Sequence, residues 1–280
     1  MHPDTMRLID RWVGIPLCFF ASFWPLKKAQ ADSNSTLATN IPPPDTIVFI
    51  LIAEIGALVV AYPAIKETRK QHPKSRICFI TAPAGLQTLE LMGFEKEDIF
   101  LLETSSIKSL LKGIVNIRSH FKGKRVSAIV LEPFTRFSTL LSAWIGASKR
   151  IGCYRFLNEG VYLGNILTHR LVYNPHLHMS QTYFALAKAL IEPDSAKPLL
   201  KEYIPSQIKN RLKINIPEKE RQTLMKRLQS ECPENPLKKI ILLNANTSDI
   251  VPLRKWPLEN FVELGKQLLE NSEFTVVLTG

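Results

Sequence analysis

The fold can be predicted from the stretch Lys239-Ile-Ile-Leu-Leu-Asn-Ala-Asn-Thr-Ser-Asp249, which continues as Ile250-Val-Pro-Leu-Arg-Lys-Trp-Pro257. Residues 240–243 are apolar and begin with β-branched side chains, which is typical of a buried parallel strand. Small polar residues follow, and they allow a tight turn with hydroxyl and backbone N–H groups. Pro257 stands where a helix is expected to begin, just after two cations. Because a helix N-terminus beside cations attracts anions, the stretch predicts an anion-binding turn.

The preceding residues alternate between strand-like apolar runs and helical stretches. This pattern is typical of an α/β fold with a parallel sheet covered on both faces. The chain ends soon after one more strand, so the second domain is expected to be incomplete in this chain. The expected strands are residues 46–52, 76–81, 98–102, 126–131 and 150–153, with a further one at 170–173, and the expected helices are 58–70, 85–92, 105–121 and 135–144.

The composition of this 280-residue chain limits the classes of partner that can be expected. The formal net charge is +11, which favours anionic partners such as phosphorylated lipid, a membrane surface or a nucleotide. No nucleic-acid-binding motif accompanies the charge, so nucleic acid is not an expected partner. The four cysteines form no CxxC pair and are expected to be free buried thiols. His176 and His178 would point to different faces of a helix, so no metal site is expected.

The front of the chain, residues 1–43, differs from the rest. Its apolar run, residues 12–26, is shorter than a transmembrane helix and contains Pro16 and Pro25. Ala29-Gln-Ala31 resembles a signal-peptide cleavage site, although the residues before the apolar run carry both acids and bases. Packing onto the following domain is another alternative. We favour a membrane-interfacial segment, with Trp12 and Trp24 at the boundary and lysines outside, followed by a linker.

The first domain carries candidate chemistry at the carboxyl ends of its expected strands, where ligands of such sheets bind. Glu54, Gly56 and Ala57 follow the first strand, and Gly56 is expected to lie in a turn that brings the backbone close to a ligand. Glu132 and Arg136 follow the fourth strand.

A separate stretch between Glu103 and Glu132 holds cations and no acid. It is either a solvated helix face or a patch for anionic lipid or a phosphorylated acceptor. Its cations are Lys108, Lys112, Arg118, Lys122, Lys124 and Arg125.

Several short motifs occur in order along the chain: Ile55-Gly56, Pro63-Ala64, Gly146-Ala147, Arg150-Ile-Gly152, the helical stretch 178–190, Asn244–Asp249, Lys255-Trp-Pro257 and the helical stretch 259–269. In this order and spacing the chain resembles glycosyltransferase family 9, the ADP-heptose:lipopolysaccharide heptosyltransferase group, over residues 45–280. The resemblance implies a GT-B fold with two Rossmann-like domains facing a cleft, here residues 44–212 for the acceptor and residues 213–280 for part of the nucleotide-sugar domain.

The resemblance also implies roles for particular residues. The donor diphosphate would meet the turn after the first strand of the second domain, without a metal or another cofactor. Gly56, Ala57 and Arg136 would lie on the acceptor side. The phosphate-binding residues would be Asn246, Thr247, Ser248, Arg254 and Lys255.

One position departs from the family pattern. The family typically carries Gly-Asp in its first turn, and the aspartate is thought to be the general base. Here the pair is Gly56-Ala57, and alanine cannot accept a proton. Glu54 or Glu132 could replace the missing base if either lies close to the acceptor oxygen.

The function predicted from the sequence is inverting transfer of a heptose-like sugar from an ADP-heptose-like nucleotide sugar to a lipid-linked or phosphorylated saccharide such as lipopolysaccharide core. The protein would be cytoplasmic and peripheral on the inner membrane. One alternative is a catalytically inactive or truncated paralogue that binds lipid or saccharide. Another is a periplasmic binding protein, which the signal-peptide alternative suggests.

Overall fold

The computed structural model describes residues 8, 10–23, 43–52, 55–154, 161–192, 212, 214, 216–231, 239–245 and 255–279. The chain divides into two compact units, Met1–Ile214 and Asn215–Gly280. Among the helices in these described ranges, none is both long and apolar enough to cross a bilayer.

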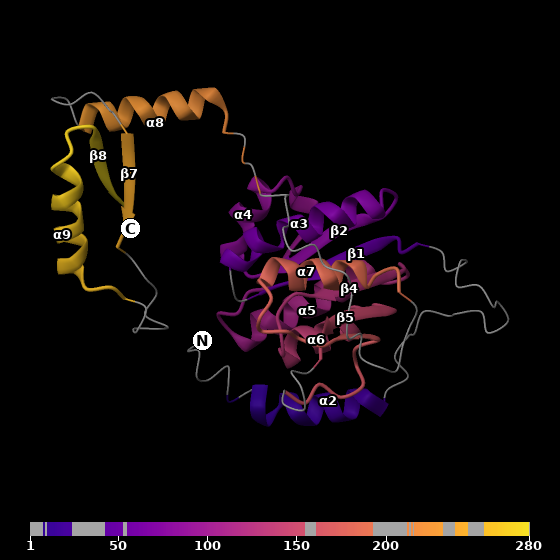
Figure 1. Cartoon of the computed structure of the whole chain (residues 1–280). Coiled ribbons are helices and arrows are strands. Elements are labelled where there is room, and N and C mark those ends of the chain that lie inside the picture. The colour runs from indigo at the N-terminus through magenta and orange to yellow at the C-terminus, as the bar shows by residue number, and fades with distance from the viewer. Residues whose placement is uncertain are drawn as a thin grey trace. The chain divides into compact units, whose positions relative to one another are not determined.

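A six-stranded parallel sheet forms the centre of the first unit (Figure 1). Its strand order is β3-β2-β1-β4-β5-β6, and every neighbouring pair is parallel. The central strands are buried along their whole length, which explains their nearly continuous apolar sequences. The strands are β1 (Thr46–Ile50), β2 (Arg76–Thr81), β3 (Ile99–Leu101), β4 (Val126–Val130), β5 (Lys149–Cys153) and β6 (His169–Leu171).

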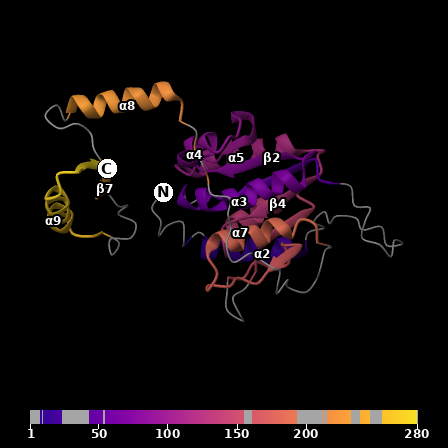
Figure 2. The same ribbon diagram turned by 45° about the horizontal axis from the view of Figure 1, so that its top comes forward.

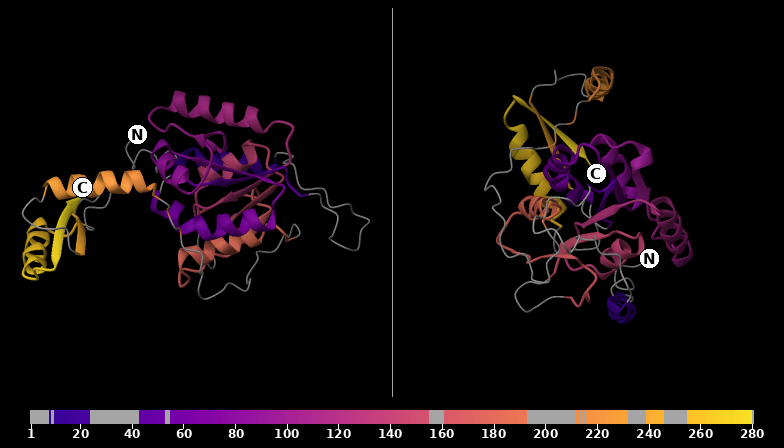
Figure 3. Two further views of the ribbon diagram at one scale, coloured as in Figure 1. Left: turned by 90° about the horizontal axis from the view of Figure 1, so that it is seen from above. Right: turned by 90° about the vertical axis from the view of Figure 1, so that its right-hand side faces the viewer.

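Helices cover both faces of this sheet, as the alternation of elements predicted (Figures 1 and 3). Ile47 and Phe49 of β1 belong to the core under α3, α4 and α7, whereas Val48 and Ile50 belong to the core under α5 and α6. Successive side chains of a strand point to opposite faces, so β1 contributes to both cores. The helices are α3 (Ile55–Gln71), α4 (Leu86–Leu91), α5 (Ile107–Phe121), α6 (Arg136–Trp144) and α7 (Met179–Lys188).

The start of α3 corrects one expectation. Gly56 lies inside the helix, which begins at Ile55, and not in a turn before it. Pro63 is also inside α3. The helix persists through Pro63 because its face at Leu58, Ala61 and Ile65 is fully buried, and packing there outweighs local propensity. Figure 2 shows α3 beside α7, which it packs against.

Arg150 is a charged side chain inside the first unit, with 1% of its surface exposed. Its guanidinium donates from Nε to the Ile166 carbonyl at 2.6 Å and from Nη1 to the carbonyls of Ala147 and Ser148 at 2.5 and 3.4 Å. The side chain therefore joins the turn before β5 to the loop before β6. Hydrogen bonds from a charged donor stabilise more than neutral ones, and a buried carbonyl that loses its donor is costly.

We expect Arg150→Met to lower the free energy of unfolding by about 3 kcal/mol or more, because buried carbonyls lose their donors. Urea unfolding followed by circular dichroism measures this loss. Arg221→Met on an exposed helix is the matched control and should change stability by less than about 0.5 kcal/mol. A loss below about 1 kcal/mol in Arg150→Met would show that the buried guanidinium is not needed for stability.

The second unit contains a strand–helix–strand arrangement at the predicted place. Strands β7 (Lys239–Asn244) and β8 (Phe274–Thr279) are parallel neighbours, with Lys239 opposite Phe274. Between them in sequence, α9 (Leu258–Leu269) begins after Pro257 and packs against β8. Helix α8 (Glu218–Glu231) precedes the pair. Every described side chain of this unit is at least partly exposed.

Candidate functional site

The first unit has a topological switch point between β1 and β4. From β1 the chain continues to β2 and β3 on one side of the sheet, whereas β4 continues to β5 and β6 on the other side. In open parallel sheets, ligands bind outside the carboxyl ends of the two strands at this point. The residues that follow β1 and β4 therefore define the candidate site, which we call the switch-point site.

The β1 side of the switch-point site is the first turn of α3. Backbone N–H groups of a first helical turn lack partners within the helix, so they can bind a polar or anionic group. Gly56 is exposed there, and a Cβ added to it would meet no atom within 4 Å. Ala57 is half-buried and packs against the core under α3. Glu54, the other predicted residue on this side, lies outside the described residues.

Glu132 forms the β4 side of the switch-point site. Its side-chain oxygen Oε1 accepts a hydrogen bond from the Ile52 N–H at 2.9 Å, and Oε2 accepts one from the Ser138 hydroxyl. Only 9% of the residue is exposed. One carboxylate thus connects the segment after β1 with the first turns of α6. These bonds favour a positioning role, and the predicted role of Glu132 as general base stays a prediction.

We expect Glu132→Gln to lower the free energy of unfolding by about 1–3 kcal/mol, since an amide cannot accept at both atoms and leaves a buried donor unsatisfied. Equilibrium urea unfolding is the measurement. Glu95→Gln, at an exposed glutamate, is the matched control and should leave stability unchanged. Equal stability of the two variants would mean that the Glu132 carboxylate does not hold the two segments together.

Phe134 lies in the loop between β4 and α6, and the sequence analysis did not identify it as a residue of the site. Its φ is 61°, in the left-handed region that a bulky side chain rarely adopts. Its ring makes an edge-on contact with Tyr173, with centroids 5.4 Å apart. Such backbone strain is retained where the surroundings fix it, and it is frequent at ligand sites. No local sequence signal for this conformation exists, because the contact partner lies after β6.

Arg136 begins α6, but its guanidinium is engaged with other parts of the unit. Nη1 donates to the Asp10 carboxylate, and Nε donates to the Tyr162 carbonyl at 3.1 Å. Its side chain is 11% exposed. The structure thus gives Arg136 a structural role between the N-terminal segment and the loop 161–165. Its predicted place on the acceptor side stays a prediction.

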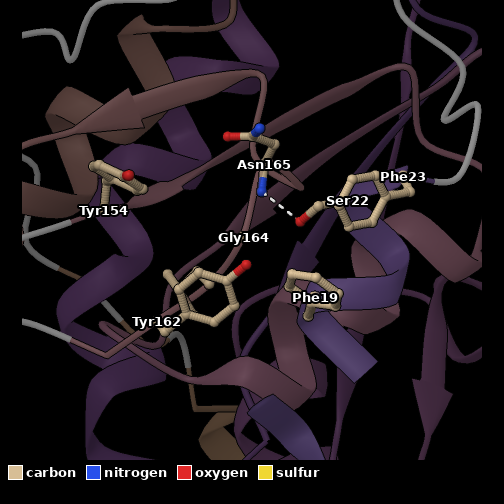
Figure 4. Close-up of a pocket in the computed structure, with 8 residues that line it drawn as sticks. Phe19, Ser22, Phe23, Tyr154, Tyr162, Gly164 and Asn165 are labelled. Atoms are coloured by element: carbon tan, nitrogen blue, oxygen red, sulfur yellow. Dashed lines mark hydrogen bonds between the residues drawn. The ribbon is translucent and has the colours of Figure 1, made fainter. Parts of the chain in front are cut away.

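A cavity of about 250 Å³ lies between helix α2 (Gly14–Phe23) and the loop 161–165 (Figure 4). Aromatic rings and small polar groups both line it. Tyr154, which follows β5, also stacks against the Arg170 guanidinium at 4.8 Å. The lining includes Phe19, Ser22, Phe23, Tyr154, Tyr162 and Asn165.

The predicted phosphate turn of the second unit is described only at its edges. The strand before it, β7, and the helix after it, α9, are both present. Lys255 is exposed just before α9, and the Trp256 ring makes an edge-on contact with Phe261 at 4.8 Å. The other predicted phosphate-binding residues lie outside the described residues: Asn246, Thr247, Ser248 and Arg254.

Metal ligands do not gather in the described part of the chain. Its His, Cys, Asp and Glu side chains form no group of three or more that could hold a metal ion. Burial raises the pKa of the Cys18 thiol to about 11 and of the Cys78 and Cys153 thiols to about 12. These three thiols are therefore protonated at neutral pH, and none is an activated nucleophile.

Solved structures share this fold. The chain matches a family 9 glycosyltransferase from Veillonella parvula with a TM-score of 0.61 at 18% identity, covering 85% of this chain and 63% of that one. It matches the E. coli ADP-heptose lipopolysaccharide heptosyltransferase II with a TM-score of 0.55 at 19% identity, covering 84% and 64%. An E. coli heptosyltransferase solved with ADP gives a TM-score of 0.51 at 13% identity, covering 83% and 67%.

No protein-family model matches the sequence, and no curated protein matches it. The chain spans less than two thirds of the length of the first two structures. At these identities the likeness shows the fold, which is the heptosyltransferase-like, GT-B type α/β fold that the sequence predicted.

Proposed function

We propose that this protein is an inverting glycosyltransferase that moves a heptose-like sugar from an ADP-heptose-like donor to a lipid-linked or phosphorylated saccharide. Within this class of acceptors we propose lipopolysaccharide core. We propose that the reaction takes place at the cytoplasmic face of the inner membrane. The likeness to solved glycosyltransferases over 83–85% of the chain carries this proposal. One of these neighbours was solved with ADP, which supports a nucleotide-sugar donor.

The chemistry requires a site for the leaving diphosphate and a base for the acceptor. The acceptor hydroxyl oxygen attacks the anomeric carbon while the bond from that carbon to the diphosphate oxygen breaks. Negative charge then builds on the diphosphate. The turn after β7, with Arg254, Lys255 and the N-terminus of α9, is proposed to stabilise this charge. No metal is needed for this step if cations and a helix end neutralise the charge.

The acceptor proton is proposed to pass to Glu54. The carboxylate of Glu132 already accepts hydrogen bonds from Ile52 and Ser138, so it is better suited to hold the segment that carries Glu54. Glu54 precedes the first turn of α3 at the switch-point site, where Gly56 faces open space. The proposed acceptor hydroxyl would lie in front of that turn.

A different function is favoured by one observation. Ala57 occupies the position where the resembled family carries its aspartate, which suggests a non-catalytic protein that binds saccharide or lipid. Both functions are compatible with the same fold. Only the enzyme would turn over the nucleotide sugar.

Ala57→Asp separates an enzyme with a relocated base from a decayed one. Because Glu54 is proposed as the base, we expect this variant to change kcat by no more than a few-fold. The measurement is the initial rate of nucleoside diphosphate release with donor and acceptor present. Ala57→Asn is the matched control for the added side chain. A gain of about 100-fold or more with aspartate alone would instead identify a decayed enzyme, since that is the usual contribution of a general base.

Donor binding tests the proposed function itself. ADP-, UDP- and GDP-sugars are titrated into the full-length protein, and calorimetry measures the heat of binding. We expect saturable binding of an ADP-sugar. The absence of binding by all three classes would remove the proposal.

A further inference from the structure

The helix α2 is fixed to the first unit by its small residues. Gly14 and Cys18 are buried, and Ser22 lies on the same side of the helix because residues four apart share a face. The Ser22 hydroxyl donates to the Cys18 carbonyl at 2.7 Å and accepts from the Asn165 N–H at 2.9 Å. We call this side, Gly14–Cys18–Ser22, the inner face of α2.

Gly164 shows how closely the inner face fits. A Cβ added to Gly164, whose φ is +60°, would lie 2.1 Å from the Ser22 hydroxyl oxygen and 2.6 Å from the Cys18 carbonyl oxygen. Near the other end of the segment, Asp10 accepts a hydrogen bond from the Arg136 guanidinium. The close approach at one end and the ion pair at the other hold α2 along α6, which it contacts.

The opposite side of the segment is apolar and exposed. Trp12, Phe20 and Phe23 are 74%, 68% and 72% exposed, and no charged residue occurs from 12 to 26. Exposed apolar patches of this kind mark sites of interaction with a partner or a membrane. We call it the outer face: Trp12, Val13, Ile15, Leu17, Phe20 and, at its border beside the cavity, Phe19 and Phe23.

The charges around the segment indicate what covers the outer face. The helix is too short to span a bilayer, for which ~20 apolar residues are needed. Arg11 is exposed at its start, the sequence continues with Lys27 and Lys28, and the chain has a net charge of +11. An apolar face with Trp12 near its start, and with cations before and after it in the sequence, suits an anionic bilayer surface.

We propose that the outer face of α2 docks on an anionic lipid bilayer while the inner face keeps the helix fixed to the first unit. The ion pair of Asp10 with Arg136 places the start of this segment where α6 begins, at the carboxyl end of β4. The start of this segment then lies at the same edge of the sheet as the switch-point site. The functional meaning of this arrangement rests on the proposed transfer to a lipid-linked acceptor. The lipid contact itself can be measured without any sugar.

The test is sedimentation of the full-length protein with phosphatidylglycerol vesicles, in the wild type and in the double variant Phe20→Ser, Phe23→Ser. We expect binding by the wild type that weakens in high salt or with phosphatidylcholine alone, and a loss of about 10-fold or more in the double variant. The matched control is Leu91→Ser with Ile191→Ser, which are 57% and 64% exposed elsewhere in the unit. It should bind as the wild type does.

A thiol assay checks that the helix stays docked, in a background that carries Cys232→Ser. Cys18 is fully buried, so it should react with an aromatic disulfide reagent far more slowly than in urea, in both the wild type and the double variant. Gly164→Ala should speed the reaction by about 10-fold or more, because α2 must move away from the added methyl group. Rapid labelling of Cys18 in the wild type would overturn the docked helix.

Two other outcomes would also overturn the proposal. In the first, wild-type protein does not bind the vesicles, and light scattering shows a dimer for the wild type but a monomer for the double variant. The outer face would then bind a second copy of the chain. If Lys108→Glu with Lys112→Glu on α5 abolishes vesicle binding and the α2 double variant does not, lipid binds the basic face of α5. Transfer to a short water-soluble acceptor needs no vesicle, so the proposed activity can survive either result.

Discussion

Glu54→Gln is expected to lower kcat for sugar transfer by about 10²- to 10⁴-fold, because glutamine cannot take the proton of the acceptor hydroxyl. The KM for the donor should change little, since other residues are proposed to bind the donor. Initial rates over a range of donor concentrations measure both constants. In the sequence, Glu54 comes between β1 and the first turn of α3.

The matched control is Glu67→Gln, on α3 but toward its opposite end, where the carboxylate accepts from Gln71. It should retain the wild-type rate. If Glu54→Gln also retains the wild-type rate, Glu54 is not the base. Glu132→Asp would then be informative, because a shorter carboxylate keeps the charge while it alters the distance to the acceptor.

The double variant Arg254→Ala, Lys255→Ala is expected to lower kcat by about 10²- to 10³-fold, as removal of groups that stabilise a developing anion does. Binding of the free nucleoside diphosphate should weaken in parallel, because the same cations are proposed to meet its phosphates. Lys255 is exposed in the short segment before α9, whose N-terminus adds a partial positive charge. Calorimetry with ADP and initial rates with an ADP-sugar are the measurements.

Lys266→Ala is the control for this variant. Lys266 is exposed on the last turn of the same helix, so the substitution removes the same side chain at the opposite end of the helix dipole. Wild-type activity is expected. Equal loss in both variants would indicate a general effect of net charge and not a phosphate site.

The centre of the sheet in the first unit could be predicted from sequence because β1, β2 and β4 are short, mainly apolar runs with local signals. Helix α5 was also local in origin, since Ser106 caps it through a hydrogen bond from the Ser109 N–H at 3.1 Å. The start of α3 could not be predicted, since Gly56 has poor helical propensity and packing of the helix against the sheet and α7 retains it there.

The candidate site was harder to predict because it, too, depends on contacts between segments that are distant in the sequence. That Glu132 follows β4 can be read from the sequence, but its bond to the Ile52 N–H joins the segments that follow two different strands. The contact between Phe134 and Tyr173 and the pairing of Asp10 with Arg136 also join distant segments. Local patterns carry no information on such contacts, so the sequence located residues at the site without revealing their partners.

The most direct measurement is the release of nucleoside diphosphate by the full-length protein when an ADP-heptose-like donor and a lipid-linked saccharide are supplied together. We expect release that saturates with donor, depends on acceptor and yields an equal amount of glycosylated lipid. No release and no binding with ADP-, UDP- and GDP-sugars would refute the assignment as a glycosyltransferase.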